Sequence, residues 1–258
     1  EVARLLGVDK LSIIAKRYGL GSKVLEDIFP EEKKGLVPST KWKKQVLEQS
    51  WYLGETVITG IGQGYIQTTP LQLCLMTAQL ANGGFKIKPN IIYNNNFNYE
   101  EILSKIQSEK NKPIEANILQ EQNINLYEKL YKNSKNIKIV LDAMYGSTNE
   151  QFGTSFRSRH KDKKYRYAGK TGTSQVRRIT EKDRELDLDT SEIEYKNRDH
   201  ALFVAFAPYD KPKYAISVLV EHGGSGSKAA APLAKKLIKK IIDRDKDREI
   251  KREELKIS

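Results

Sequence analysis

The chain has 258 residues, 30% charged and 38% hydrophobic, so it is long enough to bury a core and too balanced for a disordered chain. Its net charge of +12 favours anionic partners, although solvated lysine-rich surfaces produce the same excess. No apolar run is long enough to span a bilayer, and residues 1–9 lack the pattern of a secretion signal. The single cysteine excludes an internal disulfide and a cysteine-based metal site, and three scattered histidines argue against zinc.

The first fifty residues have the pattern of helices separated by loops. One helix is indicated by apolar residues at helical spacing, namely Leu11, Ile14, Ala15 and Tyr18. Residues 19–21, Gly-Leu-Gly, end this helix, and a polar loop with Pro30, Gly35 and Pro38 follows.

The clearest helix is predicted over residues 70–81. Thr69 is a suitable N-cap, Pro70 fits the first helical position, and Gln72 completes a capping box. Residues 82–84, Asn-Gly-Gly, end the helix. We expect its buried stripe to contain Leu71, Leu75 and Ala78, and Cys74 to be a core residue rather than a reactive thiol.

The middle of the chain changes composition twice. Residues 93–125 are rich in Asn and Lys and indicate a variable, polar surface excursion. A helix is expected from residue 126 to residue 145, with Gly146 as its stop, followed by a basic loop over 147–164.

The last third has the period of strands. Strands are predicted over 165–175, 200–207 and 214–220, and the tight turn at 208–212 favours an antiparallel pair. A closing helix follows, and its expected buried face contains Leu233, Leu237, Ile238, Ile241 and Ile242. Residues 243–258 form a charged tail that is expected to fray. This order predicts an α+β fold with helices packed on an antiparallel sheet.

Residues 170–172 carry the most specific chemistry. They read Lys-Thr-Gly, a tripeptide that penicillin-recognising serine acyltransferases combine with Ser-x-x-Lys and Ser-x-Asn. On a strand edge, Lys170 can act on the electrostatics around a nucleophilic serine, Thr171 can hold a substrate carboxylate, and Gly172 leaves room for an acyl group. The tripeptide alone is a weak signal, so its context has to decide.

That context is a set of blocks in a fixed order. The blocks are residues 51–56 (Trp-Tyr-Leu-Gly-Glu-Thr), 60–65 (Gly-Ile-Gly-Gln-Gly-Tyr), 68–73, 167–175, 200–208 and 216–224. Together they resemble the transpeptidase domain of class B penicillin-binding proteins, most of all the elongation type, penicillin-binding protein 2. The resemblance covers residues 1–242, apart from the segment 93–125.

The glycines at 60, 62 and 64 have an alternative interpretation as a phosphate-binding loop. No Lys-Ser or Lys-Thr pair follows them, and the next helix begins at a Thr-Pro cap. A tight structural turn beside the active site is therefore favoured over nucleotide binding.

The resemblance implies a penicillin-binding and serine β-lactamase-like transpeptidase fold, and an enzyme that cross-links peptidoglycan stem peptides through a serine acyl-enzyme and binds β-lactams. It implies that Lys170, Thr171 and Gly172 act in catalysis, that Thr171 and Thr173 hold the substrate carboxylate, and that the N–H of Thr173 is an oxyanion donor. It implies no metal and no organic cofactor.

The resemblance also implies partners and a location. The expected partners are a membrane glycosyltransferase of the SEDS type and scaffold proteins of the elongation complex. The expected location is the periplasmic side of the bacterial inner membrane, through an anchor that is not in this chain. A nucleic-acid partner is not expected, because the strands lack the interleaved aromatic and basic residues of a single-strand binder.

Two motifs of the family are not found where they are expected. The Ser-x-x-Lys matches at Ser158 and Ser225 lie just before Lys170 and beyond it, and Ser225 is better explained as a helix cap. The Ser-x-Asn matches at 134–136 and 147–149 follow residues 62–64, whereas the family has this motif before them. We therefore expect the fold to be incomplete at its N-terminal side, with the nucleophile, its lysine and the second motif outside this chain.

Other interpretations follow from the same absence. The chain could be a catalytically inactive fragment that acts as a binding surface. A carboxypeptidase or a β-lactamase shares Lys-Thr-Gly, but the blocks over 51–72 favour the transpeptidase. If upstream elements are absent, the strand residues expected to lose their cover are Leu202, Val204, Phe206, Ile216 and Val218.

Overall fold

The computed structural model describes residues 1–91, 128–176 and 192–257. Its helices are α1 (Val2–Leu6), α2 (Val8–Arg17), α3 (Thr40–Leu47), α4 (Leu53–Gly60), α5 (Pro70–Ala81), α7 (Ser134–Asn149) and α9 (Ala231–Ile257). Its strands are β1 (Ala168–Ser174), β2 (His200–Ala207) and β3 (Tyr214–Val220). Single helical turns are η3 (Phe156–Ser158), η4 (Lys163–Tyr165), η5 (Tyr195–Asn197) and η6 (Gly226–Ala230). The predicted excursion over 93–125 lies outside the described residues.

The strands form an antiparallel sheet in the order β1-β2-β3. In its register Lys170 lies opposite Val204, and Ala205 lies opposite Ile216. All three predicted strands and the antiparallel pairing are confirmed. Strand β1 is shorter than predicted, since residues 165–167 precede it and residue 175 follows it.

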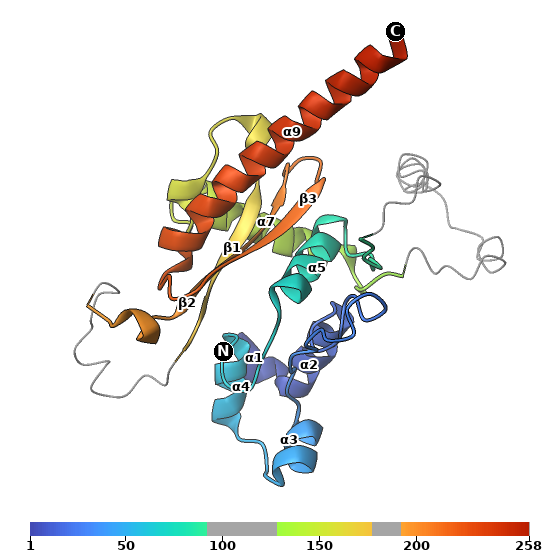
Figure 1. Ribbon diagram of the computed structural model, residues 1–258. Helices are drawn as coiled ribbons and strands as arrows, with labels where there is room; N and C mark the ends of the chain where they lie inside the picture. The colour runs from blue at the N-terminus through green and yellow to red at the C-terminus, as the bar shows by residue number, and fades with distance from the viewer. Residues whose placement is uncertain (92–127, 177–191, 258) are drawn as a thin grey trace, which may run out of the picture.

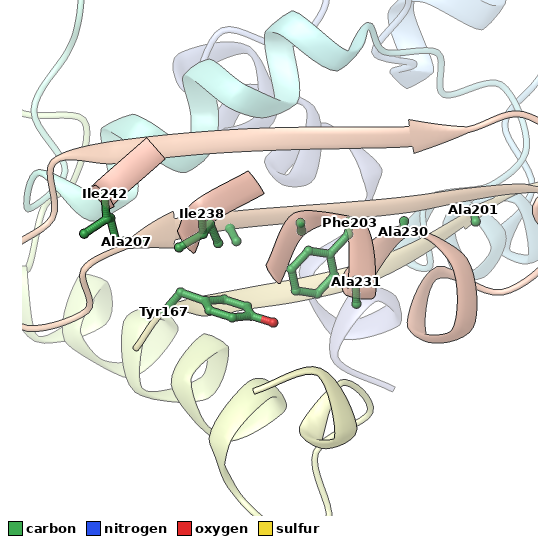
Figure 2. Close-up of a cluster of buried hydrophobic side chains, with 10 residues drawn as sticks. Tyr167, Ala201, Phe203, Ala207, Ala230, Ala231, Ile238 and Ile242 are labelled. Carbon is green, nitrogen blue, oxygen red and sulfur yellow. The ribbon is translucent and has the colours of Figure 1, made fainter. Parts of the chain in front are cut away.

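Helices cover both faces of the sheet (Figure 1). On one face, α9 packs against the side chains of Tyr167, Phe203 and their neighbours (Figure 2). On the other face, Ala168 and Phe206 pack against Met144 of α7, and α5 contacts β2 and β3. The α+β architecture predicted from the sequence is confirmed.

The buried stripe of α9 differs from the predicted one. Ile238 and Ile242 are buried as predicted, but Leu233 and Leu237 are 43% and 46% exposed, and Ala231 and Ala234 are buried in their place. Alanine at two of these positions lets the helix backbone approach the sheet closely, which a hydrophobicity pattern does not reveal.

The tail that was expected to fray continues α9 to Ile257. Two carboxylates at the start of this tail anchor it. The Tyr165 hydroxyl donates to Asp243 at 2.5 Å, and the Tyr214 hydroxyl donates to Asp245. Lys164 and Lys239 also donate to Asp243, and these hydrogen bonds lower the pKa of its carboxyl group. Among the described residues, no helix is both long and apolar enough to cross a membrane.

The predicted limits and caps of α5 are confirmed, and its buried face is not. Thr69 and Gln72 form the reciprocal capping box, but Leu71 is 37% exposed while Gln72, Thr77 and Gln79 are buried. The Gln72 amide donates to the carbonyls of Ser22 and Lys34 at 2.6 and 2.9 Å, and the Gln79 amide donates to the carbonyl of Tyr18 at 2.9 Å. Buried glutamines therefore connect α5 to the N-terminal loops.

Cys74 on α5 is half-buried, and its thiol lies 3.4 Å from the carbonyl of Ala215 on β3. Burial raises the pKa of this thiol. Both observations agree with a core residue rather than a reactive nucleophile.

Helix α7 begins and ends later than predicted. Asn133 caps its start by accepting from the N–H of Lys135, and residues 126 and 127 lie outside the described part of the chain. Gly146, the predicted stop, lies inside the helix, which continues to Asn149. The backbone of Gly153 packs against this last turn so closely that a Cβ on Gly153 would lie 2.4 Å from the carbonyl of Gly146. Gly153 therefore packs on the last turn of α7, so the helix continues past Gly146, where the sequence pattern predicts a stop.

The N-terminal helices agree in outline with the sequence. The predicted helix corresponds to α2, and Gly19 after it has a φ of 97°. The glycine-rich segment after α4 is the predicted turn, with positive φ at Gly62 and Gly64. The separate helices α1, α3 and α4 were not predicted.

Candidate active site

The Lys-Thr-Gly residues lie on β1, which forms an edge of the sheet in the described part of the molecule. Side chains alternate along a strand, so Lys170 shares a face with Ala168, the face that packs against α7. Lys170 is exposed, and its ammonium donates to the carbonyl of Thr171 at 3.0 Å. Lys170 therefore projects from β1 into solvent on the face of the sheet that α7 covers.

Backbone groups of β1 point away from β2 at alternate residues. The carbonyls of Tyr167 and Gly169 accept hydrogen bonds from the side chains of Asn149 and Thr148 at the end of α7, at 2.9 and 3.4 Å. By the same alternation, the N–H and C=O groups of Thr171 and Thr173 point to this outer edge. Such an edge can donate to an oxyanion or pair with an extended peptide.

Gly172 and Gly226 are held in close contact. A Cβ on Gly172 would lie 3.2 Å from the Cβ of Leu202, so the glycine relieves crowding within the sheet. A Cβ on Gly226, at the start of η6, would lie 2.6 Å from the carbonyl of Gly172. Only glycine at 226 lets η6 support the backbone of the Lys-Thr-Gly strand in this way.

A chain of hydroxyl groups reaches Thr171 from the segment after α7. Thr154 Oγ1 lies 3.3 Å from Thr171 Oγ1 and 3.3 Å from Ser147 Oγ. Sequence analysis did not identify Thr154, because a small polar residue in a loop carries no motif that indicates such a contact, and it named Ser147 only as part of a Ser-x-Asn match.

The motif matches rejected on sequence order have structural roles. Ser158 is buried, and its carbonyl accepts from the Tyr167 hydroxyl at 2.7 Å, while burial raises the pKa of that phenol. Ser225 precedes η6 but makes no side-chain capping bond, and its hydroxyl lies 3.0 Å from that of Ser227. Ser225 therefore occupies the N-cap position of η6, as expected, but its side chain does not make the capping hydrogen bond. Residues 147–149 lie beside β1 and bond to its backbone and to Thr154.

No metal-binding group is evident at the site. Within the residues that the structure describes, no three His, Cys, Asp or Glu side chains are arranged to hold an ion.

A family model described as the penicillin-binding protein transpeptidase domain matches residues 1–239. The chain belongs to this transpeptidase family. Curated relatives named peptidoglycan D,D-transpeptidase MrdA are 33% identical to it in Salmonella typhimurium and in Haemophilus influenzae, each over 92% of the chain. The chain spans 35% and 33% of the length of these two relatives, about a third of each.

Solved structures of transpeptidases share the fold. Penicillin-binding protein 2 of Pseudomonas aeruginosa has 35% identity and a TM-score of 0.69, covering 92% of the chain and 44% of that protein. Penicillin-binding protein 2 of Helicobacter pylori, solved in complex with MreC, has 31% identity and a TM-score of 0.71, covering 94% of the chain and 37% of that protein. The predicted penicillin-binding fold and the resemblance to penicillin-binding protein 2 are confirmed.

Proposed function

We propose that this chain forms the Lys-Thr-Gly side of the active site of a peptidoglycan D,D-transpeptidase that acts in cell-wall elongation. One observation carries the proposal. An exposed lysine and a strand edge with outward-pointing N–H groups lie together on β1 in a transpeptidase-family chain. The substrates are stem peptides of peptidoglycan, and β-lactams are acylating inhibitors.

Each residue on the strand has a separate role in this proposal. The ammonium of Lys170 provides positive charge beside the attacking serine and the carbonyl that it attacks. The hydroxyls of Thr171 and Thr173 bind the substrate carboxylate, and the N–H of Thr173 donates to the oxyanion. Gly172 leaves space for the acyl group. Neither a metal nor an organic cofactor takes part.

The attacking serine comes from sequence outside these 258 residues in our proposal. Support comes from the two Ser-x-x-Lys matches, since Ser158 is buried and Ser225 follows Lys170 in the chain. We use "complete transpeptidase" for a protein that carries this chain together with a Ser-x-x-Lys and a Ser-x-Asn segment.

The partners and location belong to the same proposal. The Helicobacter pylori relative was solved with MreC, which supports a scaffold protein of the elongation complex as a partner here. A membrane glycosyltransferase of the SEDS type is the other expected partner. The complete transpeptidase acts on the periplasmic side of the inner membrane.

A binding surface without catalysis is the second candidate. It is favoured by the absence of a correctly placed Ser-x-x-Lys in the sequence. Covalent labelling of the complete transpeptidase by penicillin separates the two candidates, because a binding surface alone forms no acyl-enzyme.

The test is the Lys170→Ala variant of the complete transpeptidase. Loss of the ammonium should slow acylation by a fluorescent penicillin by about 100-fold, the usual cost of one charge-stabilising group. Because Lys170 is exposed, the melting temperature should stay within a few degrees. Lys41→Ala, which removes an exposed lysine from α3, is the control. Equal acylation of the Lys170 variant and the wild type would refute the proposed role of the strand.

A further inference from the structure

The segment that carries Thr154 is fixed to the end of α7. The N–H and the hydroxyl of Ser155 both donate to the carbonyl of Ser147, each at 3.0 Å. Ser155 is 1% exposed, and the neighbouring Gly153 has no space for a side chain. Thr154 itself is exposed, and its hydroxyl lies 3.3 Å from the hydroxyl of Thr171 on β1.

Hydrogen-bonding capacity sets the direction of the hydroxyl chain. A lysine ammonium only donates, so Thr171 Oγ1 is the acceptor for Lys170 Nζ, 3.4 Å away. A bound carboxylate only accepts, so it would take the single hydroxyl proton of Thr171. Thr154 must then donate to Thr171, and its own oxygen is left to accept from Ser147. A bound carboxylate therefore sets the direction of these hydrogen bonds: Ser147 donates to Thr154, and Thr154 donates to Thr171.

We propose that Thr154 is a positioning residue for the transpeptidase reaction. Its hydroxyl donates to Thr171 and aims the proton of Thr171 at the substrate carboxylate, and Ser147 supports Thr154 in the same way. Chained hydroxyl donors polarise one another, which strengthens the last hydrogen bond toward an anion. The inference depends on the proposed role of Thr171 as a carboxylate ligand.

The first part of the test compares Thr154→Val, which keeps the shape of the side chain, with Thr154→Ser, which keeps the hydroxyl. In the complete transpeptidase, Thr154→Val should weaken the initial non-covalent binding of a fluorescent penicillin about three- to tenfold, the range for one hydrogen bond. The limiting rate constant of acylation should change less, because in this proposal Thr154 contacts neither the attacking serine nor the reacting carbonyl. Thr154→Ser should restore binding. Phe152→Ala, at a 97% exposed position in the same segment, is the matched control and should bind as the wild type does.

The second part repeats Thr154→Val in a Thr171→Val background. If Thr154 acts through Thr171, the second substitution should add no further loss. A penicillin methyl ester, which lacks the carboxylate, should react equally with the wild type and Thr154→Val.

The outcomes separate this inference from the proposed function. If Thr171→Val is without effect, the role of Thr171 in the proposed function is wrong. If Thr171→Val weakens binding but Thr154→Val does not, or if the two losses are additive, the positioning role of Thr154 is overturned. A thermal unfolding curve for each variant checks that it is folded, and Ser147→Ala, with an expected smaller loss, replaces Thr154→Val if that variant unfolds.

Discussion

The ammonium of Lys43 is buried among aromatic rings where α3 meets α4. Its side chain is 1% exposed, and its Nζ lies 2.5 Å from the carboxylate of Glu55 and 4.8 Å from the ring of Tyr52. Glu55 also accepts from the N–H of Tyr52 at 2.8 Å. This pair accounts for part of the block over 51–56 that resembles penicillin-binding protein 2: its glutamate neutralises a buried lysine.

Removal of one partner should therefore be costly. Lys43→Ala in the complete transpeptidase should lower the free energy of unfolding by about 2 kcal/mol or more, because the partly exposed carboxylate of Glu55 loses its cation and the buried lysine side chain is removed from among the aromatic rings. Lys44→Ala, at the exposed neighbouring position, should change it by less than about 0.5 kcal/mol. Chemical denaturation measures both values, and similar values for the two variants would contradict the structural role of the pair.

The same pair makes stability depend on pH. Burial raises the pKa of Glu55, but hydrogen bonds from Lys43 and from the N–H of Tyr52, with the charge of Lys43, lower it overall below 4.5. A lowered pKa means that the stabilisation is present above about pH 4.5 and is lost as the pH falls through the folded-state pKa.

The measurement for this pH dependence compares the wild type with Glu55→Gln. The wild type should be more stable than the variant at neutral pH, and the difference in unfolding free energy should shrink on acidification toward about pH 3. A difference that stays constant over this range would show that Glu55 does not titrate as proposed.

Helix α5 illustrates what a local pattern predicts and what it leaves open. The Thr69–Gln72 capping box involves residues three apart, so its chemistry is legible in the sequence and is confirmed. The second use of Gln72, as donor to the carbonyls of Ser22 and Lys34, depends on segments about 40 to 50 residues away in the chain. Periodicity therefore assigned the buried face to Leu71 rather than to Gln72.

The functions of Gln72 can be tested against its neighbour. Gln72→Leu removes the donor to the part-buried carbonyls of Ser22 and Lys34 and the acceptor of the Thr69 N–H, and it should lower the free energy of unfolding by about 2 kcal/mol or more. Leu71→Gln, at the 37% exposed position, should cost less than about 1 kcal/mol. Urea denaturation of the complete transpeptidase measures both changes. An equal or larger loss of unfolding free energy for the Leu71 variant would favour the buried face that the sequence predicted, which contains Leu71.

The candidate site shows the same limit. Lys170 and Thr171 were predicted because a tripeptide and its surrounding blocks are contiguous in the sequence. Thr154 contacts Thr171 and Gly226 contacts Gly172, from 17 and 54 positions away, and both contacts exist only because α7 and η6 pack against the sheet. Neither a single loop hydroxyl nor a glycine that allows close backbone approach produces a periodic pattern in the sequence.

Exposed apolar side chains across the molecule are concentrated on the N-terminal helices rather than on the sheet. Phe206, expected to be bare, is 1% exposed, and Leu202, Val204, Ile216 and Val218 are half-buried. By contrast, Leu5 on α1, Ile13 on α2, Leu53 on α4 and Ile61 after α4 are 57–73% exposed. The sheet keeps its cover because α5, α7 and α9 come from this chain.

The exposed apolar side chains of the N-terminal helices, rather than those of the sheet, are therefore the reason to expect that the isolated chain is unstable. Leaving several such side chains in water costs about 1.5–3 kcal/mol each, against a total stability of about 5–15 kcal/mol for a domain. The 258-residue chain by itself should be molten or prone to aggregate, and it should unfold cooperatively when a Ser-x-x-Lys segment of the family is supplied. Calorimetry and light scattering test this, and a sharp two-state transition of the isolated monomer would contradict it.

The position of the acylated serine is the most direct test of the proposed division of the active site. The chain alone and the complete transpeptidase are incubated with fluorescent penicillin, separated by denaturing electrophoresis, and the labelled peptide is identified by mass spectrometry. We predict no covalent label on the chain alone, and a label on the complete transpeptidase at a serine outside these 258 residues. A label on Ser158, Ser225 or any other serine of this chain would contradict the account.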